Sequence, residues 1–168
     1  MQIKLLTPTD MPATGRITVQ VTNGTLTSST VNVTPQAVAP SFFVWDTASP
    51  IAATHADYSY LGTATSTPPG TPAKPGETIV LWGNGWGPTN PAEVNGQVQA
   101  GAAPMVQMPT IQFSSLNGTV QFAGLTSQST GLYQINVTIP SGVADGEVVV
   151  VATAAGVTAP YAVITVKQ

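Results

Sequence analysis

The chain has 168 residues, of which only four are Lys or Arg and seven are Asp or Glu, and its net charge is −3. Ordinary domains carry about 25% charged residues, so the polar surface here has to be built from Thr, Ser, Asn and Gln, as in many exported β-proteins. No basic patch is present for a nucleic acid, no apolar run is long enough to span a bilayer, and the absence of cysteine excludes disulfides and thiolate metal sites.

Alternating apolar and polar residues predict two strands near the start of the chain, residues 16–22 and 30–34. Asn23-Gly24 lies between them. This pair favours a type I′ hairpin turn, because both central residues of that turn need positive φ.

The end of the chain repeats its beginning. Gln2-Ile3 aligns with Gln134-Ile135 and, after a one-residue gap, Gly15 aligns with Gly146. Internal similarity of this kind indicates tandem modules. We expect residues 1–37 to be a partial β-module, the last strands of a preceding copy, and residues 38–168 to form one complete module.

Four later segments also read as strands: residues 78–82, 132–139, 147–153 and 161–166. A second Asn-Gly pair, Asn117-Gly118, predicts another hairpin, between residues 110–115 and 119–123. Residues 148–151 are four valines, which predicts a central strand covered on both faces; a strand whose outer face is merely less polar stays open as the alternative. Four prolines within residues 63–76 predict a long surface loop.

Three segments resemble one known family. Residues 74–89 read KPGETIVLWGNGWGPT, residues 122–125 (FAGL) are followed by GLYQINV at 131–137, and VAPSFF at 38–43 precedes His55-Ala56-Asp57. Together they resemble the Solibacter-type C-terminal module of large secreted acidobacterial proteins, with departures at Trp82, Trp86 and Tyr58. The resemblance implies an all-β, antiparallel immunoglobulin-like β-sandwich on an exported protein, and it brings no known catalytic residues.

His55 and Asp57 form the one close His–carboxylate pair, and residues two apart in a strand share a face, so the two could share a ligand or a proton. Catalysis would need a further nucleophile or metal ligand. We therefore favour a structural role, in which a hydrogen bond at the end of a strand fixes the loop before Tyr58.

Trp82 and Trp86 lie in a glycine-rich loop around Asn84. We expect Trp82 to be buried and Trp86 to be exposed, where it could stack on a sugar or on a partner; the alternative is that one or both cap the open end of the core. The acidic residues are scattered, so no calcium cage or other cofactor site is expected.

If residues 1–35 lack an opposite sheet, an apolar face stays uncovered, and we take five of its side chains as a candidate assembly surface: Ile17, Val19, Val21, Val31 and Val33. This surface could fold back on the complete module, or a neighbouring subunit could cover it. Our hypothesis is a non-catalytic structural module outside the cell or at its surface that self-associates, as a filament, surface-layer or stalk component, with copies of itself or neighbouring β-modules as partners. The alternative is a carbohydrate- or surface-binding adhesion module that uses loop aromatics, and a hydrolase built around His55 is third.

Overall fold

The computed structural model describes residues 7–8, 10–12, 14–46 and 50–168, and in these the regular structure is entirely β. In chain order the strands are β1 (Ile17–Val19), β2 (Thr22–Asn23), β3 (Leu26–Thr27), β4 (Val31–Val33), β5 (Ser41–Phe42), β6 (Ala53–His55), β7 (Thr78–Asn84), β8 (Ala103–Pro104), β9 (Thr110–Phe113), β10 (Leu116–Asn117), β11 (Thr119–Leu125), β12 (Tyr133–Thr138), β13 (Gly146–Ala154), β14 (Val157–Thr158) and β15 (Ala162–Val166). None of the described segments is a helix long and apolar enough to cross a bilayer.

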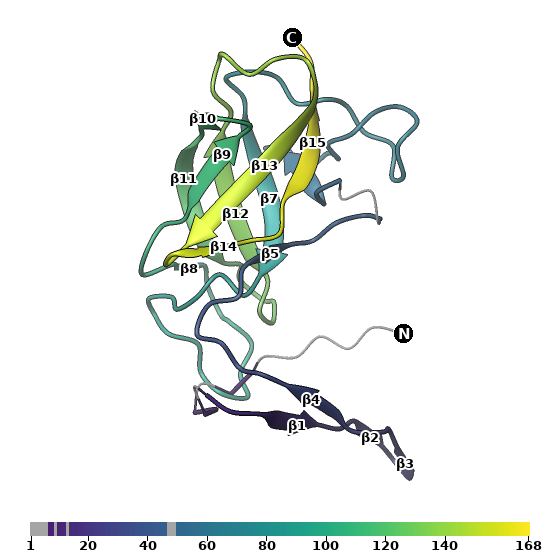
Figure 1. Cartoon of the computed structure of the whole chain (residues 1–168), viewed down its shortest axis with the longest axis vertical. Helices are drawn as coiled ribbons and strands as arrows, with labels where there is room; N and C mark the ends of the chain where they lie inside the picture. Colours follow the sequence, from purple (N-terminus) through teal and green to yellow (C-terminus); the bar gives the residue numbers. More distant parts are fainter. Residues whose placement is uncertain (1–6, 9, 13, 47–49) are drawn as a thin grey trace.

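Two antiparallel sheets face each other as a β-sandwich (Figure 1). One has the order β5–β7–β12–β11–β8, with β6 on the same edge of β7 as β5. The other has the order β10–β9–β13, and both β14 and β15 pair with the far side of β13. The prediction of an all-β antiparallel fold is confirmed.

The core follows from side-chain alternation along the long strands. In β12 the buried residues are Tyr133, Ile135 and Val137, and in β13 every second residue from Val148 to Ala154 is buried. Val149, however, is 40% exposed. The strand is central in its sheet, but only one of its faces is covered, so the alternative with an apolar outer face is the correct one.

The two Asn-Gly predictions place the turns wrongly. In the first hairpin Asn23 pairs with Leu26, so the turn consists of Gly24 and Thr25. In the second, Phe113 pairs with Leu116, so the turn between β9 and β10 lies at residues 114–115.

Gly118 serves packing, because it stands where the chain passes from β10 in one sheet to β11 in the other. A Cβ at this position would lie 2.7 Å from both the Phe113 ring and the Val137 side chain. Close approach of the backbone to the core therefore explains the glycine, and a hairpin does not.

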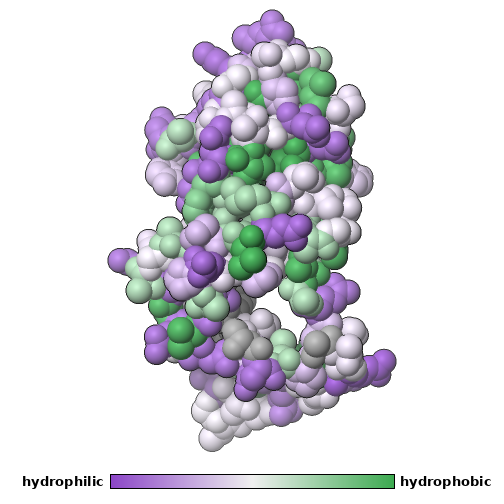
Figure 2. Space-filling model, turned by 90° about the vertical axis from the view of Figure 1, so that its left-hand side faces the viewer, coloured by the Kyte–Doolittle hydropathy of each residue, from purple (hydrophilic) through white to green (hydrophobic). Residues whose placement is uncertain are grey.

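The first four strands form a separate two-stranded ribbon, in which β1 pairs with β4 and β2 with β3. The ribbon, defined as residues 16–34, projects away from the sandwich in Figure 1. Figure 2 keeps the vertical axis of Figure 1, so the ribbon lies at the foot of the molecule in this view as well. Asp10, which precedes the ribbon in the chain, accepts a hydrogen bond of 3.3 Å through Oδ1 from Asn95 Nδ2 in the segment between β7 and β8.

Candidate functional site

His55 ends β6 and bonds to Thr71 of the proline-rich segment 63–76 and to Glu77, the residue that follows this segment. Its Nδ1 hydrogen-bonds to Glu77 Oε1, and its Nε2 lies 2.8 Å from Thr71 Oγ1. The second carboxylate oxygen of Glu77 accepts a bond of 2.8 Å from the Lys74 amide. His55 therefore fastens β6 to residues 71–77, and not the loop before Tyr58, as the sequence suggested.

Asp57 does not join this arrangement. Its Oδ1 accepts bonds from the Ser59 amide (3.0 Å) and the Ser59 hydroxyl (2.6 Å), which close the turn after β6. These bonds stabilise the carboxylate and hold the pKa of Asp57 below its ordinary value. The predicted His55–Asp57 pair is thus replaced by two separate interactions, and sequence reasoning missed Glu77 and Thr71 because they are distant in the chain.

The Glu77 carboxylate, the His55 imidazole and the Thr71 hydroxyl follow one another in the order found in hydrolytic triads. Acyl transfer also needs backbone N–H groups aimed at the developing oxyanion. Around Thr71 these groups are already used: the amides of Thr71, Ala73 and Lys74 donate to Tyr60 O, Thr165 O and Glu77 Oε2, and Pro72 has none. Residues 71–74 therefore offer no oxyanion donors, and the geometry suits a structural tie.

The same residues line an open surface depression of about 640 Å³, whose lining includes Lys74 and Lys167. Within the described part of the chain, no group of three or more His, Asp or Glu side chains is placed to hold a metal ion.

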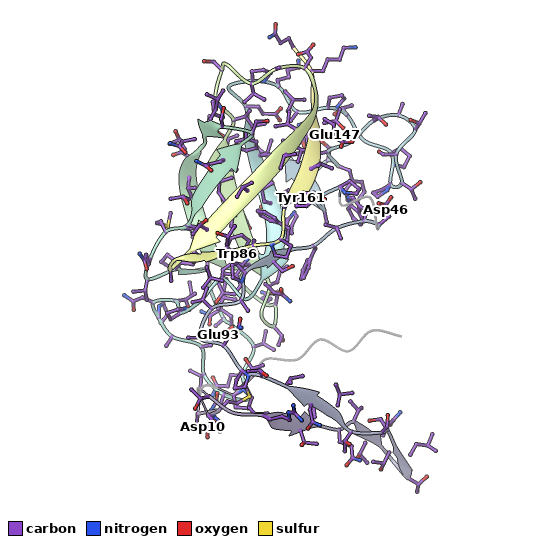
Figure 3. The ribbon with its side chains drawn as sticks, in the orientation of Figure 1. Asp10, Asp46, Trp86, Glu93, Glu147 and Tyr161 are labelled. Carbon is purple, nitrogen blue, oxygen red and sulfur yellow. The ribbon has the colours of Figure 1, made fainter. Side chains whose placement is uncertain are left out.

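Trp86 corrects the sequence prediction. Its side chain is only 1% exposed and packs on Phe42, with ring centroids 5.1 Å apart. Figure 3 shows it at the end of the sandwich that faces the ribbon. Trp82, which was expected to be buried, is half-exposed instead.

The glycines around Trp86 explain its burial. Gly85 has φ +71, and a Cβ there would lie 2.1 Å from Ala39 O, while a Cβ at Gly83 would lie 2.7 Å from the Trp86 ring nitrogen. Only glycine at these positions lets the backbone around Ala39 pass this close, and the Trp86 indole is enclosed beneath that backbone. Asn84 stays exposed at the end of β7, opposite Ser41 in the register. It therefore shares no exposed site with Trp86.

Four other aromatic side chains gather in two pairs that sequence reasoning missed. Tyr58 lies against Trp82, with ring centroids 6.3 Å apart, and Trp45 meets Tyr60 edge-on at 5.5 Å. Tyr58 has φ +66, a conformation that favours glycine. The sequence gives no local signal for these pairs, because Trp82 and Tyr58 lie 24 residues apart and Trp45 and Tyr60 lie 15 apart.

The five predicted assembly residues lie on one face of the ribbon, with Ile17 paired to Val33 and Val19 to Val31. Val19, Val21, Val31 and Val33 are all exposed. The opposite face carries polar groups, including a 3.0 Å hydrogen bond from Thr18 Oγ1 to Asn32 Oδ1.

The ribbon and the strands β13–β15 have the same pairing when 131 is added to each residue number of the ribbon. The β1–β4 pairs Ile17↔Val33, Thr18↔Asn32 and Val19↔Val31 become the β13–β15 pairs Val148↔Ile164, Val149↔Val163 and Val150↔Ala162. The pair Thr22↔Thr27 becomes Thr153↔Thr158, and in both pairs the two hydroxyls lie within 3.4 Å of each other. The ribbon face formed by the five assembly residues corresponds to residues of β13 and β15 that are buried in the core.

Comparison of the chain with models of known protein families, with curated proteins and with solved structures finds no match in any of the three.

Proposed function

We propose that the chain is a non-catalytic structural module that self-associates through its ribbon. One observation carries the proposal: the ribbon pairs like β13–β15, but no strand in the described part of the chain covers the face that those strands bury, and its four valines are exposed. An isolated two-stranded hairpin is only marginally stable in water. Full burial of a Val or Ile side chain stabilises by about 1.5–3 kcal/mol, so a surface that covers this face would be bound favourably.

The partner in this proposal is a second copy of the chain. In that copy the sheet formed by β7, β12 and β11 is already covered by β13 and β15. Without unfolding, the matching surface is therefore the ribbon of the second copy. Two ribbons packed face to face about a two-fold axis would form a small four-stranded sandwich, and such a contact closes as a dimer. Growth into a filament would need a second contact.

Within the same proposal, residues 1–37 are the end of a preceding copy of an immunoglobulin-like module, and the protein works outside the cell or at its surface. The constant offset of the register supports the repeat. The sparse charge and the resemblance to the Solibacter-type module support the location.

Sedimentation velocity over a wide concentration range tests the association. The wild-type chain should show a monomer–dimer equilibrium, and Val19→Asp should shift it to monomer because a carboxylate would be buried in the contact. Thr18→Asp is the matched control, one residue away on the polar face, and should still dimerise. A wild-type chain that stays monomeric at every concentration, or a Val19→Asp variant that dimerises like wild type, contradicts the proposal.

The absence of cysteine allows a second readout. In Val31→Cys the single thiol faces the contact, and mild oxidation should give a covalent dimer. In Asn32→Cys the thiol lies on the opposite face and should stay monomeric under the same conditions. Equal cross-linking of the two variants would contradict packing through this face.

A further inference from the structure

We propose that Tyr58, Trp82, Trp45 and Tyr60 form a binding platform for a neutral polysaccharide on the outer face of the β6–β7 sheet. The four residues are called the aromatic platform below. It is distinct from the ribbon, and neither the His55 cluster nor Trp86 belongs to it.

The register places the platform on the outer face. Thr54 pairs with Val80 and bridges to Tyr60, and Trp82 lies two residues from Val80 on the same side of β7. Thr54 and Val80 are buried although they point away from the core. Tyr60 and Trp82 flank these two residues in the register, and the rings still present surface to solvent: Tyr58 is 61% exposed and Tyr60 46%.

Tyr58 is held in an unfavourable backbone conformation. Its φ of +66 lies in the left-handed region, which a residue with a side chain adopts less readily than glycine. The strain places the exposed ring beside Trp82, with an interplanar angle of 32°. Stored backbone strain of this kind is typical of residues that serve recognition.

The polar side chains beside Trp82 on this face of the sheet are uncharged amides. Gln134 lies opposite Trp82 in the register and Asn136 opposite Val80, and Gln134 Nε2 donates to Asn136 Oδ1 at 2.8 Å. Amide groups beside aromatic rings suit a sugar, whose hydroxyls need hydrogen bonds and whose C–H face stacks on a ring.

No described cation lies at the platform. Arg16 lies at the start of the ribbon, and Lys74 and Lys167 line the depression at His55. His55 alternates with Thr54 and so points to the opposite face of β6. An anionic polymer such as a nucleic acid would find no charge partner here, whereas a neutral polysaccharide needs none.

Affinity electrophoresis tests the proposal with full-length protein in native gels that contain hydroxyethyl cellulose, xylan or galactomannan. At least one polysaccharide should retard the wild-type chain, and the retardation should persist at high salt because no ion pair is involved. Tyr58→Gly should weaken binding by about tenfold or more, which corresponds to about 1.4 kcal/mol. This variant removes the ring at a position where glycine is unstrained, so the fold should be kept.

The matched control is Tyr161→Ala, which removes an exposed tyrosine from the residue before β15 (Figure 3). The Tyr161→Ala protein should be retarded in the polysaccharide gels as much as the wild-type chain. Val19→Asp should also bind like wild type, so failure of the ribbon proposal would not affect this one. No retardation by any of the three polysaccharides, equal losses in Tyr58→Gly and Tyr161→Ala, or platform-dependent binding to phosphatidylcholine vesicles instead would overturn the proposal.

Discussion

The ribbon and the strands β13–β15 share one pairing register, yet Val19 is 37% exposed whereas its counterpart Val150 is fully buried. The alternation of apolar residues is alike in the two regions, so local sequence decides which residues pair and which face is apolar. It does not decide whether that face is covered. In the sandwich the sheet of β7, β12 and β11 covers it, and in the ribbon no described strand does. A β-hairpin can therefore carry the pattern of a core element without having a core.

The strongest test of this contrast places the same charge at equivalent positions. Val150→Asp would bury a carboxylate without a partner, and we expect a loss of more than about 4 kcal/mol in the free energy of unfolding, a large share of the roughly 5–15 kcal/mol that stabilises a typical domain. Val19→Asp should change the unfolding of the sandwich by less than about 0.5 kcal/mol in dilute solution. Urea denaturation followed by tryptophan fluorescence measures both, with Trp86 as the buried reporter. Equal losses would mean that the ribbon belongs to the cooperative core.

Hydrogen exchange should separate the two regions without any mutation. Backbone amides paired within β13 should exchange only through global unfolding, which slows them by about a thousandfold or more. Amides paired between β1 and β4 should exchange close to the rate of unprotected amides in the monomer, because the ribbon opens locally. At high protein concentration the ribbon amides should slow as the dimer forms. Ribbon amides as slow as those of β13 in dilute solution would show that a surface of the same chain covers the ribbon.

The two turns offer a smaller test. Ala155 and Gly156 have φ of +47 and +81, as a type I′ turn requires, whereas at the ribbon tip only Gly24 of the two turn residues has positive φ (+61). Ala155→Gly should stabilise the sandwich by roughly 0.5–1 kcal/mol, because relief of the strain exceeds the added entropy of the unfolded chain. Thermal unfolding measures the gain. Gly24→Ala should leave the melting temperature of the sandwich unchanged, and a drop would contradict the independence of the ribbon.

The fold class, the long strands and the repeated pairing could be read from the sequence, because alternation and turn residues act locally. The turns at Asn23-Gly24 and Asn117-Gly118 were misplaced for different reasons. In the first the pairing register shifts the turn by one residue. In the second, Gly118 is a glycine because a Cβ there would clash with the side chains of Phe113 and Val137, and this contact with Val137 is not visible in the local sequence.

The candidate sites were predicted less well than the strands, because they depend on contacts between distant segments. The exposures of Trp82 and Trp86 were exchanged, since nothing local shows that Ala39 and Phe42 close over Trp86. His55 was singled out, but its partners Glu77 and Thr71 lie 22 and 16 residues away. The apolar face of the ribbon could be predicted from the sequence, because it depends only on the alternation of side chains between the two faces of a strand.

The turn between Thr54 and Tyr60, which pair antiparallel, gives the smallest expected change in stability. Like the tip of the ribbon, this turn is held without burial. The fully exposed Asp57 accepts two bonds from Ser59, and its pKa is lowered from 3.8 in the folded chain. A lowered pKa means that the carboxylate contributes stability above the ordinary value, and this contribution is lost as the pH falls through the folded pKa. The melting temperature of wild type should therefore exceed that of Asp57→Asn slightly at pH 6, and the difference should shrink as the pH falls below 3.8. Ser59→Ala should raise the pKa of Asp57 towards 3.8, measured by NMR titration of the carboxyl group. An unchanged titration in Ser59→Ala would show that these bonds do not hold the turn, and the parallel with the ribbon tip would then fail.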